Sequence, residues 1–519
     1  MNNWISKITL FFKNIITNKV LIITIFAFLI IFIILIPYTE NYLWDNSIMK
    51  ILSKGSFSSY NTFDLSYNTA GNPSSRFNML QSIDLYSFQK TLLYWISLII
   101  IWILTFFLYI FGLFKLYSSL FSNTRKLLLL LIIVALVTLL IKILQPLSPF
   151  IAPIPFAAIV VSILFNPVVS LFTIVHLSIV AALFFYLDFS LFIILLFSSV
   201  ISVYTVKNAV QRTMIVRAGV EIAIANVFLI TLFGVLLRIT PQQIIIFCFW
   251  GILNGLISSI LSLGLLPFLE NIFNIITPMR LVELSNPNHY LLKKLMVEAP
   301  GTYQHSLMVA NLAEAAAEAI GANGLLIRIG CYYHDVGKLK RPLFFIENQK
   351  WADNPHNKLA PQLSATIITN HTKDGVSLLR EYRLPAFLYD FVREHHGKGL
   401  VAYFYRQMLQ QKDKNFDEEE FRYDGPKPQS KETALLMLAD TIEAAVRSLE
   451  KPTPNKIESL IDKLFKEKLN DNQLDSAPLT LLELTTIKEA FVRILVNTFH
   501  NRIEYPEVDT ENGETGSSN

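Results

Sequence analysis

Histidine and aspartate side chains in the C-terminal half are the residues most able to do chemistry. Imidazole and carboxylate groups together suit iron, manganese or zinc, and no cysteine cluster accompanies them, which argues against a structural zinc site. A lone histidine on a helix is more often a packed or surface residue than a ligand. Seven such residues in one half of the chain weaken that interpretation and predict a metal site: His305, His334, Asp335, His371, His395, His396 and Asp440.

Two pairs of adjacent residues sharpen this prediction. His334 and Asp335 close a predicted helix, and His395 and His396 stand directly before a glycine. Adjacent residues on a helix diverge by about 100°, but at a helix end both can reach one binuclear centre. Cys331, three residues before His334, is interpreted as a small core residue.

The segments that must position these residues are predicted to be helical. From residue 280 onward the apolar pattern has helical spacing, without the alternation typical of strands. Residues 269–300 are predicted to form a helical connector that ends at an Ala-Pro-Gly break, and residues 301–506 an all-helical domain. The acidic, Gly/Ser-rich tail 507–519 is predicted to be disordered. The predicted fold class is all-α.

The N-terminal half is predicted to lie in a lipid bilayer. The chain is 53% hydrophobic and only 16% charged, whereas soluble proteins carry about 25% charged residues. Residues 1–38 hold one apolar run and are interpreted as a membrane anchor, followed by a short polar segment at 39–91. A seven-helix membrane domain is expected at 92–268, because apolar runs long enough to cross a bilayer occupy residues 92–116, 127–144, 148–166, 168–187, 189–206, 218–237 and 242–268.

Basic residues near these runs predict the orientation. With eight spans, the N-terminus, the Arg125-Lys126 turn, the loop with Lys207 and Arg212, and the C-terminal half share one side and hold most of the basic residues. That side is expected to be the cytoplasm, and segment 39–91 the extracytoplasmic side. The net charge of +4 is too small to argue for a nucleic-acid polymer as partner.

Two ionisable residues inside the predicted spans are candidates for function. His176 and Glu221 would be costly in lipid. We favour a structural interpretation, in which His176 bonds a neighbouring helix and Glu221 lies near the cytoplasmic interface. The runs show no paired broken helices, which weakens a transporter interpretation.

The order His305, His334-Asp335, Asp440 resembles the H…HD…D signature of the HD phosphohydrolase superfamily. Longer stretches are similar to the PgpH-type seven-transmembrane HD proteins, which are bacterial cyclic di-AMP phosphodiesterases: LVELSNPNHYLLKKLMVEAPGTYQHS, CYYHDVGKLKRPLFFIENQ, REHHG and FRYDGPKPQSKETALLMLADTIEAAVRSL. The resemblance implies a multi-pass protein of the bacterial cell membrane with a cytoplasmic HD domain. Family members carry a large extracytoplasmic domain after the first helix, so segment 39–91 implies a missing or minimal sensor.

The resemblance also implies two divalent transition-metal ions, iron or manganese above all. One would be held by His305, His334, Asp335 and Asp440. The other would be held by Asp335, His371, His395 and His396, so that Asp335 bridges the pair. Asp335 is then a catalytic residue, because two metals can activate water against a phosphodiester. Lys338 is a further catalytic candidate, and Lys338 and Lys427 are candidates for contact with the substrate's phosphate.

The implied reaction is hydrolysis of cyclic di-AMP to the linear dinucleotide pApA. Alternatives are cyclic di-GMP or a (p)ppGpp-type nucleotide as substrate, or a receptor that binds nucleotide without cleaving it. The residues after His395-His396 are Gly-Lys-Gly-Leu and lack the Gly-Tyr-Pro motif of the cyclic di-GMP branch. The preference for adenine comes from the resemblance alone. A homodimer is also allowed by this interpretation.

The charge asymmetry makes the topology testable. Reporter fusions should place residue 65 outside the cell, and residue 210 and the C-terminus inside, because basic loops stay in the cytoplasm. A cytoplasmic signal from a fusion at residue 65 would contradict the eight-span arrangement.

Overall fold

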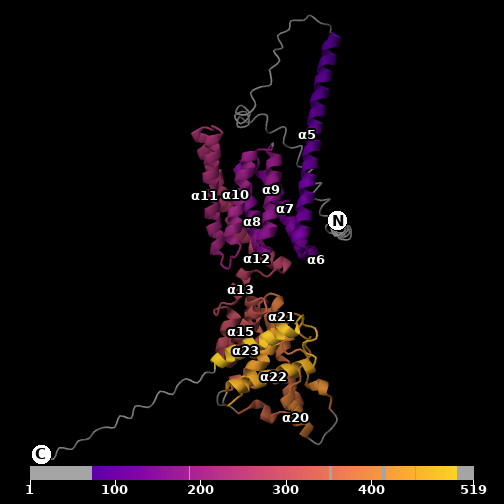
Figure 1. The fold of residues 1–519 in the computed structure, drawn as a ribbon, viewed down its shortest axis with the longest axis vertical. Coiled ribbons are helices and arrows are strands. Elements are labelled where there is room, and N and C mark those ends of the chain that lie inside the picture. Colours follow the sequence, from indigo (N-terminus) through magenta and orange to yellow (C-terminus); the bar gives the residue numbers. More distant parts are fainter. Residues whose placement is uncertain (1–72, 186, 350–352, 411–415, 451, 499–519) are drawn as a thin grey trace, which may run out of the picture. The chain divides into compact units, whose positions relative to one another are not determined.

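The computed structural model describes residues 73–185, 187–349, 353–410, 416–450 and 452–498 (Figure 1). The predicted anchor at 1–38, the first part of segment 39–91 and the tail 507–519 lie outside these residues. The chain divides into two compact units, Met1–Arg280 and Leu281–Asn519. The described residues form helices, with one isolated antiparallel bridge between Leu400 and Arg422. The predicted all-α class is confirmed.

Seven helices of the first unit occupy the seven apolar runs predicted between residues 92 and 268. Six contain a stretch long and apolar enough to cross a membrane. The seven helices, with two shorter elements, are α5 (Pro73–Leu116), α6 (Ser119–Ser122), α7 (Thr124–Leu144), η2 (Pro149–Ile151), α8 (Ile154–Leu164), α9 (Pro167–Phe184), α10 (Phe189–Val206), α11 (Thr213–Leu236) and α12 (Pro241–Phe273).

The run predicted at 148–166 differs from a single long span. It forms the short 3₁₀ helix η2 followed by the 11-residue helix α8. Pro149 and Pro153 interrupt this stretch, because proline lacks the N–H that an α-helix needs in its interior. The segment is nevertheless buried throughout α8, so it packs among its neighbours rather than facing lipid.

Two polar residues between the predicted spans, Asn166 and Asp188, are helix caps. The Asn166 side chain accepts a hydrogen bond from the Val169 N–H at 2.9 Å, and the Asp188 carboxylate accepts from the Ser190 and Leu191 N–H groups. Each side chain satisfies backbone donors that the first helical turn leaves unpaired. These residues therefore fix where α9 and α10 begin.

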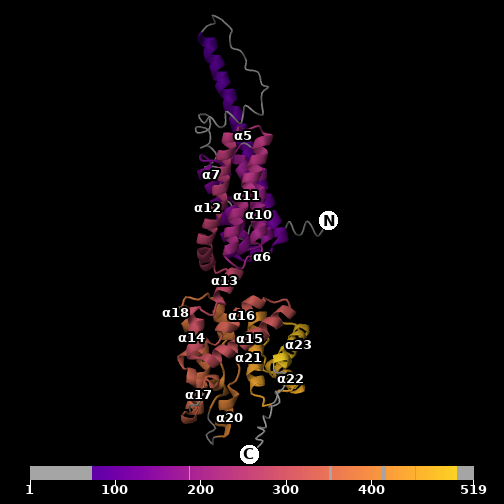
Figure 2. The ribbon, with the colours of Figure 1, turned by 90° about the vertical axis from the view of Figure 1, so that its left-hand side faces the viewer.

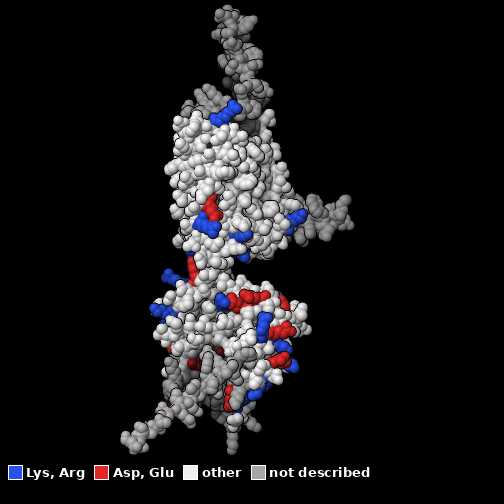
Figure 3. Space-filling view, turned by 60° about the vertical axis from the view of Figure 1, so that its left-hand side comes forward, with Lys and Arg blue, Asp and Glu red and all other residues white. Residues whose placement is uncertain are grey.

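The two ionisable residues predicted inside the spans have different surroundings. Among the residues that the structure describes, both ring nitrogens of His176 are buried without a hydrogen-bond partner, so His176 meets its neighbouring helix through ring packing and not through the expected bond. The ring of His176 is buried and stacks on that of Tyr109, with centroids 5.0 Å apart. The Glu221 carboxylate pairs with Arg217 at 2.7 Å and accepts a hydrogen bond from the Thr205 hydroxyl. Such charged groups are sparse on this unit: most of its surface in Figure 3 is uncharged.

The second unit is a helical domain whose centre is formed by α15 and α21, with α22 and α23 on one side and α14 and α18 on the other (Figure 2). Its core includes Leu312, Leu436 and Phe491, all fully buried. Its helices, with α13 at the division between the units, are α13 (Pro278–Leu284), α14 (Tyr290–Glu298), α15 (Pro300–Ala319), α16 (Gly324–Tyr333), α17 (Pro361–Thr369), α18 (His371–Glu381), α19 (Phe387–Glu394), α20 (Ala402–Gln410), α21 (Lys431–Arg447), α22 (Pro454–Asn470) and α23 (Leu481–Thr498). Short 3₁₀ helices connect them: η3 (Val336–Lys340), η4 (Pro342–Phe344), η5 (Ile346–Asn348), η6 (Pro355–Lys358) and η7 (Glu418–Phe421).

Helices α11 and α12 approach closely at Gly219 and Gly255. A Cβ on Gly255 would lie 2.4 Å from the Gly219 carbonyl oxygen and 2.8 Å from the Ala223 nitrogen. Both obstacles are backbone atoms, which cannot rotate away as a side chain can. Small residues allow this kind of backbone contact between membrane helices.

We expect Gly255→Ala to destabilise the first unit by about 1–3 kcal/mol, the usual cost of overpacking. Gly264→Ala is the matched control on the same helix, because a Cβ there has nothing within 4 Å. The control should be neutral or stabilising by up to about 1 kcal/mol through helix propensity. Thermal denaturation of the detergent-solubilised protein measures both. Equal melting temperatures for the two variants would contradict the close contact.

Candidate metal centre

The seven predicted site residues come from five separate segments of the second unit. His305 lies in the middle of α15, and His334 and Asp335 follow α16 directly. His371 is the first residue of α18. The remaining three are His395 and His396, immediately after α19, and Asp440 on α21.

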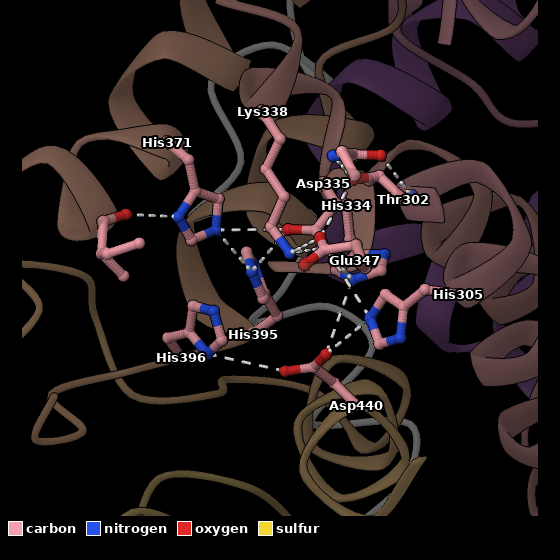
Figure 4. Close-up of polar contacts among 12 residues, drawn as sticks. Thr302, His305, His334, Asp335, Lys338, Glu347, His371, His395, His396 and Asp440 are labelled. Atoms are coloured by element: carbon pink, nitrogen blue, oxygen red, sulfur yellow. Dashed lines mark hydrogen bonds and ion pairs between the residues drawn. The ribbon is translucent and has the colours of Figure 1, made fainter. Parts of the chain in front are cut away.

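The structure brings all seven residues together (Figure 4). One group is formed by His305, His334 and Asp440, whose ligand atoms lie within 4.8 Å of one another. The His305 Nε2 is 3.0 Å from Asp440 Oδ1, and the His334 Nε2 is 3.8 Å from the same oxygen. All three residues are buried, so the group is shielded from bulk water.

A second group is formed by His371, His395 and His396, again with ligand atoms within 4.8 Å of one another. The Nε2 atoms of His371 and His395 are 3.1 Å apart. His396 is the most exposed of the three, with 23% of its side chain accessible. Its Nδ1 lies 3.6 Å from Asp440 Oδ2, which links this group to the first.

Asp335 lies between the two groups and presents one oxygen to each. Its Oδ2 is 3.3 Å from the His334 Nε2 and 3.7 Å from the His305 Nε2. Its Oδ1 is 3.3 Å from the His371 Nε2 and 3.7 Å from the His395 Nε2. Figure 4 shows the carboxylate between His371 and His305. A bridging ligand for two metals requires this arrangement.

Hydrogen bonds to the backbone orient three of the imidazole rings. The Nδ1 atoms of His334, His371 and His395 lie 2.6 to 2.9 Å from the carbonyl oxygens of Cys331, Ile368 and Val392, respectively. A carbonyl only accepts, so each Nδ1 carries a proton and each Nε2 is the ring atom that faces Asp335. A proton on Nδ1 and a free Nε2 is the form that binds a metal, and such bonds hold the ring in place.

Glu443 is a site residue that the sequence prediction missed. Its Oε2 lies 2.5 Å from the Nδ1 of His305, and the residue is buried. The Nδ1 of His305 thus bonds a carboxylate, whereas the Nδ1 atoms of His334, His371 and His395 bond backbone carbonyls. A signal existed in the spacing, because Glu443 follows Asp440 by three residues and so shares its helix face.

The distance between the two groups is set by a backbone contact. A Cβ on Gly337 would lie 1.8 Å from the His371 carbonyl oxygen and 2.6 Å from the Gly375 nitrogen. Helix η3, which follows Asp335, and helix α18, which begins at His371, therefore touch without a side chain between them. Only glycine at position 337 permits this approach.

Burial and neighbouring charges set the protonation of the cluster. Burial lowers the pKa of His395 to about 3, helped by the neighbouring His334 and His371, and burial also lowers the pKa of His371. Burial alone would raise the pKa of Asp335, but His334 and Lys338 outweigh it and hold that pKa well below its usual range. His371 and His395 are therefore neutral and Asp335 ionised near neutral pH, the states that metal ligation needs.

His305 and His334 behave differently, because carboxylates surround them. Burial opposes their charged form, yet Asp440 and Glu443 raise the pKa of His305 to about 9, and Asp335 and Asp440 raise that of His334 to about 10. A cation is thus favoured at this place, either a proton on the rings or a metal ion that displaces it.

The unpaired atoms of the cluster fit metal ions. Within the described residues, the His334 Nε2 and both carboxylate oxygens of Asp335 are buried without a hydrogen bond of good geometry, although the Lys338 ammonium lies 2.7 Å from Asp335 Oδ2. Leaving such groups uncompensated is costly, and a coordinated cation would satisfy all three. The donor set of nitrogen and oxygen atoms suits divalent transition metals. The cluster could therefore hold metal ions.

The two predicted lysines have different surroundings. The Lys338 Nζ lies 2.7 Å from Asp335 Oδ2 and 2.8 Å from Glu347 Oε1, so this residue belongs to the centre. Glu347 in turn accepts a hydrogen bond from the Thr302 hydroxyl. The Lys427 Nζ pairs instead with Asp475 at 3.4 Å, and it is not among the clustered residues.

Two family models match the chain in succession. Residues 92–277 match the family described as 7TM receptor with intracellular HD hydrolase, and residues 302–445 match the HD domain. The first unit is thus a multi-pass membrane domain. The resemblance predicted from the His-Asp motifs is confirmed.

Two of the similar proteins carry the same name. The chain is 44% identical over 368 residues to the cyclic-di-AMP phosphodiesterase PgpH of Bacillus subtilis strain 168, over 69% of this chain and 51% of that protein. It is 40% identical over 364 residues to PgpH of Listeria monocytogenes strain 10403S, over 69% of this chain and 50% of that one. The chain therefore spans about half the length of these curated relatives.

A solved structure also matches the second unit in sequence. The crystal structure of the HD domain of the L. monocytogenes phosphodiesterase PgpH in complex with cyclic-di-AMP is 46% identical to this chain. The match covers 42% of this chain and 100% of that one, with a TM-score of 0.40.

Asp335→Asn tests the bridging position. The amide keeps the size of the side chain but loses its charge, so we expect the purified variant to bind fewer metal ions than the wild type while remaining folded. Elemental analysis after metal loading and circular dichroism measure the two properties. Asp374→Asn is the control, because this carboxylate pairs with Arg341 outside the cluster. Full metal content in Asp335→Asn would contradict the bridge.

Proposed function

Because this chain belongs to the 7TM proteins with an intracellular HD hydrolase domain, we propose that it is a membrane-bound, metal-dependent phosphodiesterase that hydrolyses cyclic di-AMP to pApA. The observation that carries the proposal is the position of Asp335, whose two oxygens each face a different group of histidines. The nucleotide is suggested by the names of the two PgpH relatives, since no contact in the cluster selects adenine.

The two groups would each hold one ion, with Asp335 shared between them. When bound, a pair of divalent ions lowers the pKa of a water molecule and stabilises charge on the phosphate oxygens. The neutral rings of His371 and His395 and the carboxylates of Asp335 and Asp440 would bind and orient the ions. No nucleophilic side chain is required. Iron and manganese fit this donor set best.

Lys338 would add positive charge at the edge of the centre. Its ammonium is held between Asp335 and Glu347, and these two ion pairs restrict the side chain to one position. Burial opposes its charge, but the two carboxylates outweigh burial and raise the pKa of Lys338, so it remains an ammonium. A fixed cation at this place suits an anionic phosphodiester.

We also propose that the HD domain faces the cytoplasm. The basic residues Lys207 and Arg212 of the loop between α10 and α11, and Arg217 at the start of α11, belong to the same side as the chain that leaves α12 toward the HD domain. Lys and Arg concentrate on the cytoplasmic side of short membrane loops. A nucleotide made inside the cell would then reach the centre directly.

The activity is tested with the purified full-length chain in detergent. It should convert cyclic di-AMP to pApA with Mn²⁺ or Fe²⁺, and removal of metal by a chelator should abolish the reaction. Asp335→Asn should lower turnover by at least about three orders of magnitude, because both ions and the alignment of the water depend on it. Product analysis by chromatography, with cyclic di-GMP as the competing substrate, measures this. Preferred cleavage of cyclic di-GMP, or near-normal turnover by Asp335→Asn, would contradict the proposal.

A further inference from the structure

His396 is held differently from the other four histidines of the centre. His334, His371 and His395 bond backbone carbonyls through Nδ1, and His305 bonds Glu443. Within the described residues, neither ring nitrogen of His396 makes a hydrogen bond. It is also the most exposed ligand candidate of its group. Apart from the 3.6 Å contact between its Nδ1 and Asp440 Oδ2, its ring is oriented by packing.

Tyr423 provides that packing. Its ring lies 4.2 Å from the ring of His396, centroid to centroid, with 30° between the planes. It also meets the ring of His371 edge-on at 5.9 Å. Aromatic pairs in this distance range stabilise one another beyond the area they bury. The tyrosine thus touches two of the three histidines in the second group.

The backbone around Tyr423 is fixed on the segment that follows His396. The Tyr423 N–H donates to the Gly399 carbonyl at 3.1 Å, and the Arg422 guanidinium donates to the Lys398 carbonyl at 2.8 Å. Leu400 and Arg422 form the isolated bridge. The backbone at Tyr423 is therefore joined to the segment that directly follows the histidine it covers.

The hydroxyl of Tyr423 is free to act on a ligand. Within the described part of the chain it has no hydrogen-bond partner, although the residue is only partly exposed. The ring contacts with His396 and His371 place this residue beside the second group of histidines. A phenol hydroxyl can donate a hydrogen bond.

We propose that Tyr423 is a substrate-binding and positioning residue: its ring holds His396 in the orientation that a metal needs, and its hydroxyl donates a hydrogen bond to an oxygen of the bound phosphodiester. This inference rests on the proposed function in one respect, namely that the substrate is a phosphodiester. It does not depend on which base the nucleotide carries. A hydroxyl without a protein partner, beside a centre suited to an anion, has a phosphate oxygen as its natural acceptor.

Two substitutions separate the roles of the ring and the hydroxyl. Tyr423→Phe removes only the hydroxyl, whereas Tyr423→Ala removes both. Tyr403→Phe is the control, because Tyr403 lies on α20 and is 68% exposed. For each full-length variant in detergent we would measure bound metal per chain, the Kd of a phosphorothioate analogue of cyclic di-AMP, and kcat and KM for cyclic di-AMP and for bis(p-nitrophenyl) phosphate.

Tyr423→Phe should keep the wild-type metal content but bind the analogue about tenfold more weakly, the usual scale of one hydrogen bond to a charged group. Tyr423→Ala should in addition bind less metal, because His396 loses its support. The control should match the wild type in every measurement.

Wild-type affinity and kinetics in Tyr423→Phe would overturn the hydroxyl contact, and full metal content in Tyr423→Ala would overturn the positioning role. A metal loss in Tyr423→Phe as large as in Tyr423→Ala would also contradict the division of roles. If the wild type cleaves bis(p-nitrophenyl) phosphate but not cyclic di-AMP, the proposed function fails, and the kinetics with the smaller diester still decide on Tyr423.

Discussion

The buried carboxylate of Asp335 is the constraint on which the second unit depends. The residue is 1% exposed, and neither oxygen has a hydrogen bond of good geometry among the described residues. An ionised group in such a place is costly unless positive charge compensates it. Four imidazole rings and the Lys338 ammonium lie within 4.0 Å of its oxygens. The helices of the domain are arranged so that their ends deliver these groups to one point.

Much of the fold and the centre could be predicted from the sequence, because the residues concerned belong to distinctive types or patterns. Seven histidines and aspartates in one helical domain are unusual, and apolar runs of bilayer length are easily recognised. The boundaries between the apolar runs were harder to predict. Asn166 and Asp188 cap α9 and α10, a role that depends on which backbone donors they meet.

Glu443 and Tyr423 show where prediction from one sequence stops. A glutamate in a helix and a tyrosine in a loop are ordinary residues, and their importance arises only from contacts with His305 and His396 across long stretches of chain. The run at 148–166 was predicted as one long span, whereas it forms η2 and the shorter helix α8, for another reason. Its apolar length was sufficient for a span, but the prolines before it decide where helical hydrogen bonds can begin.

The glycine contact beside the centre has an evolutionary consequence. Apolar side chains in the core can exchange for others of similar volume at small cost, so most of this domain can drift in sequence. Position 337 has no such freedom, because any side chain would meet the backbone of His371 and Gly375. The spacing between the two halves of the centre is therefore inherited through main-chain geometry.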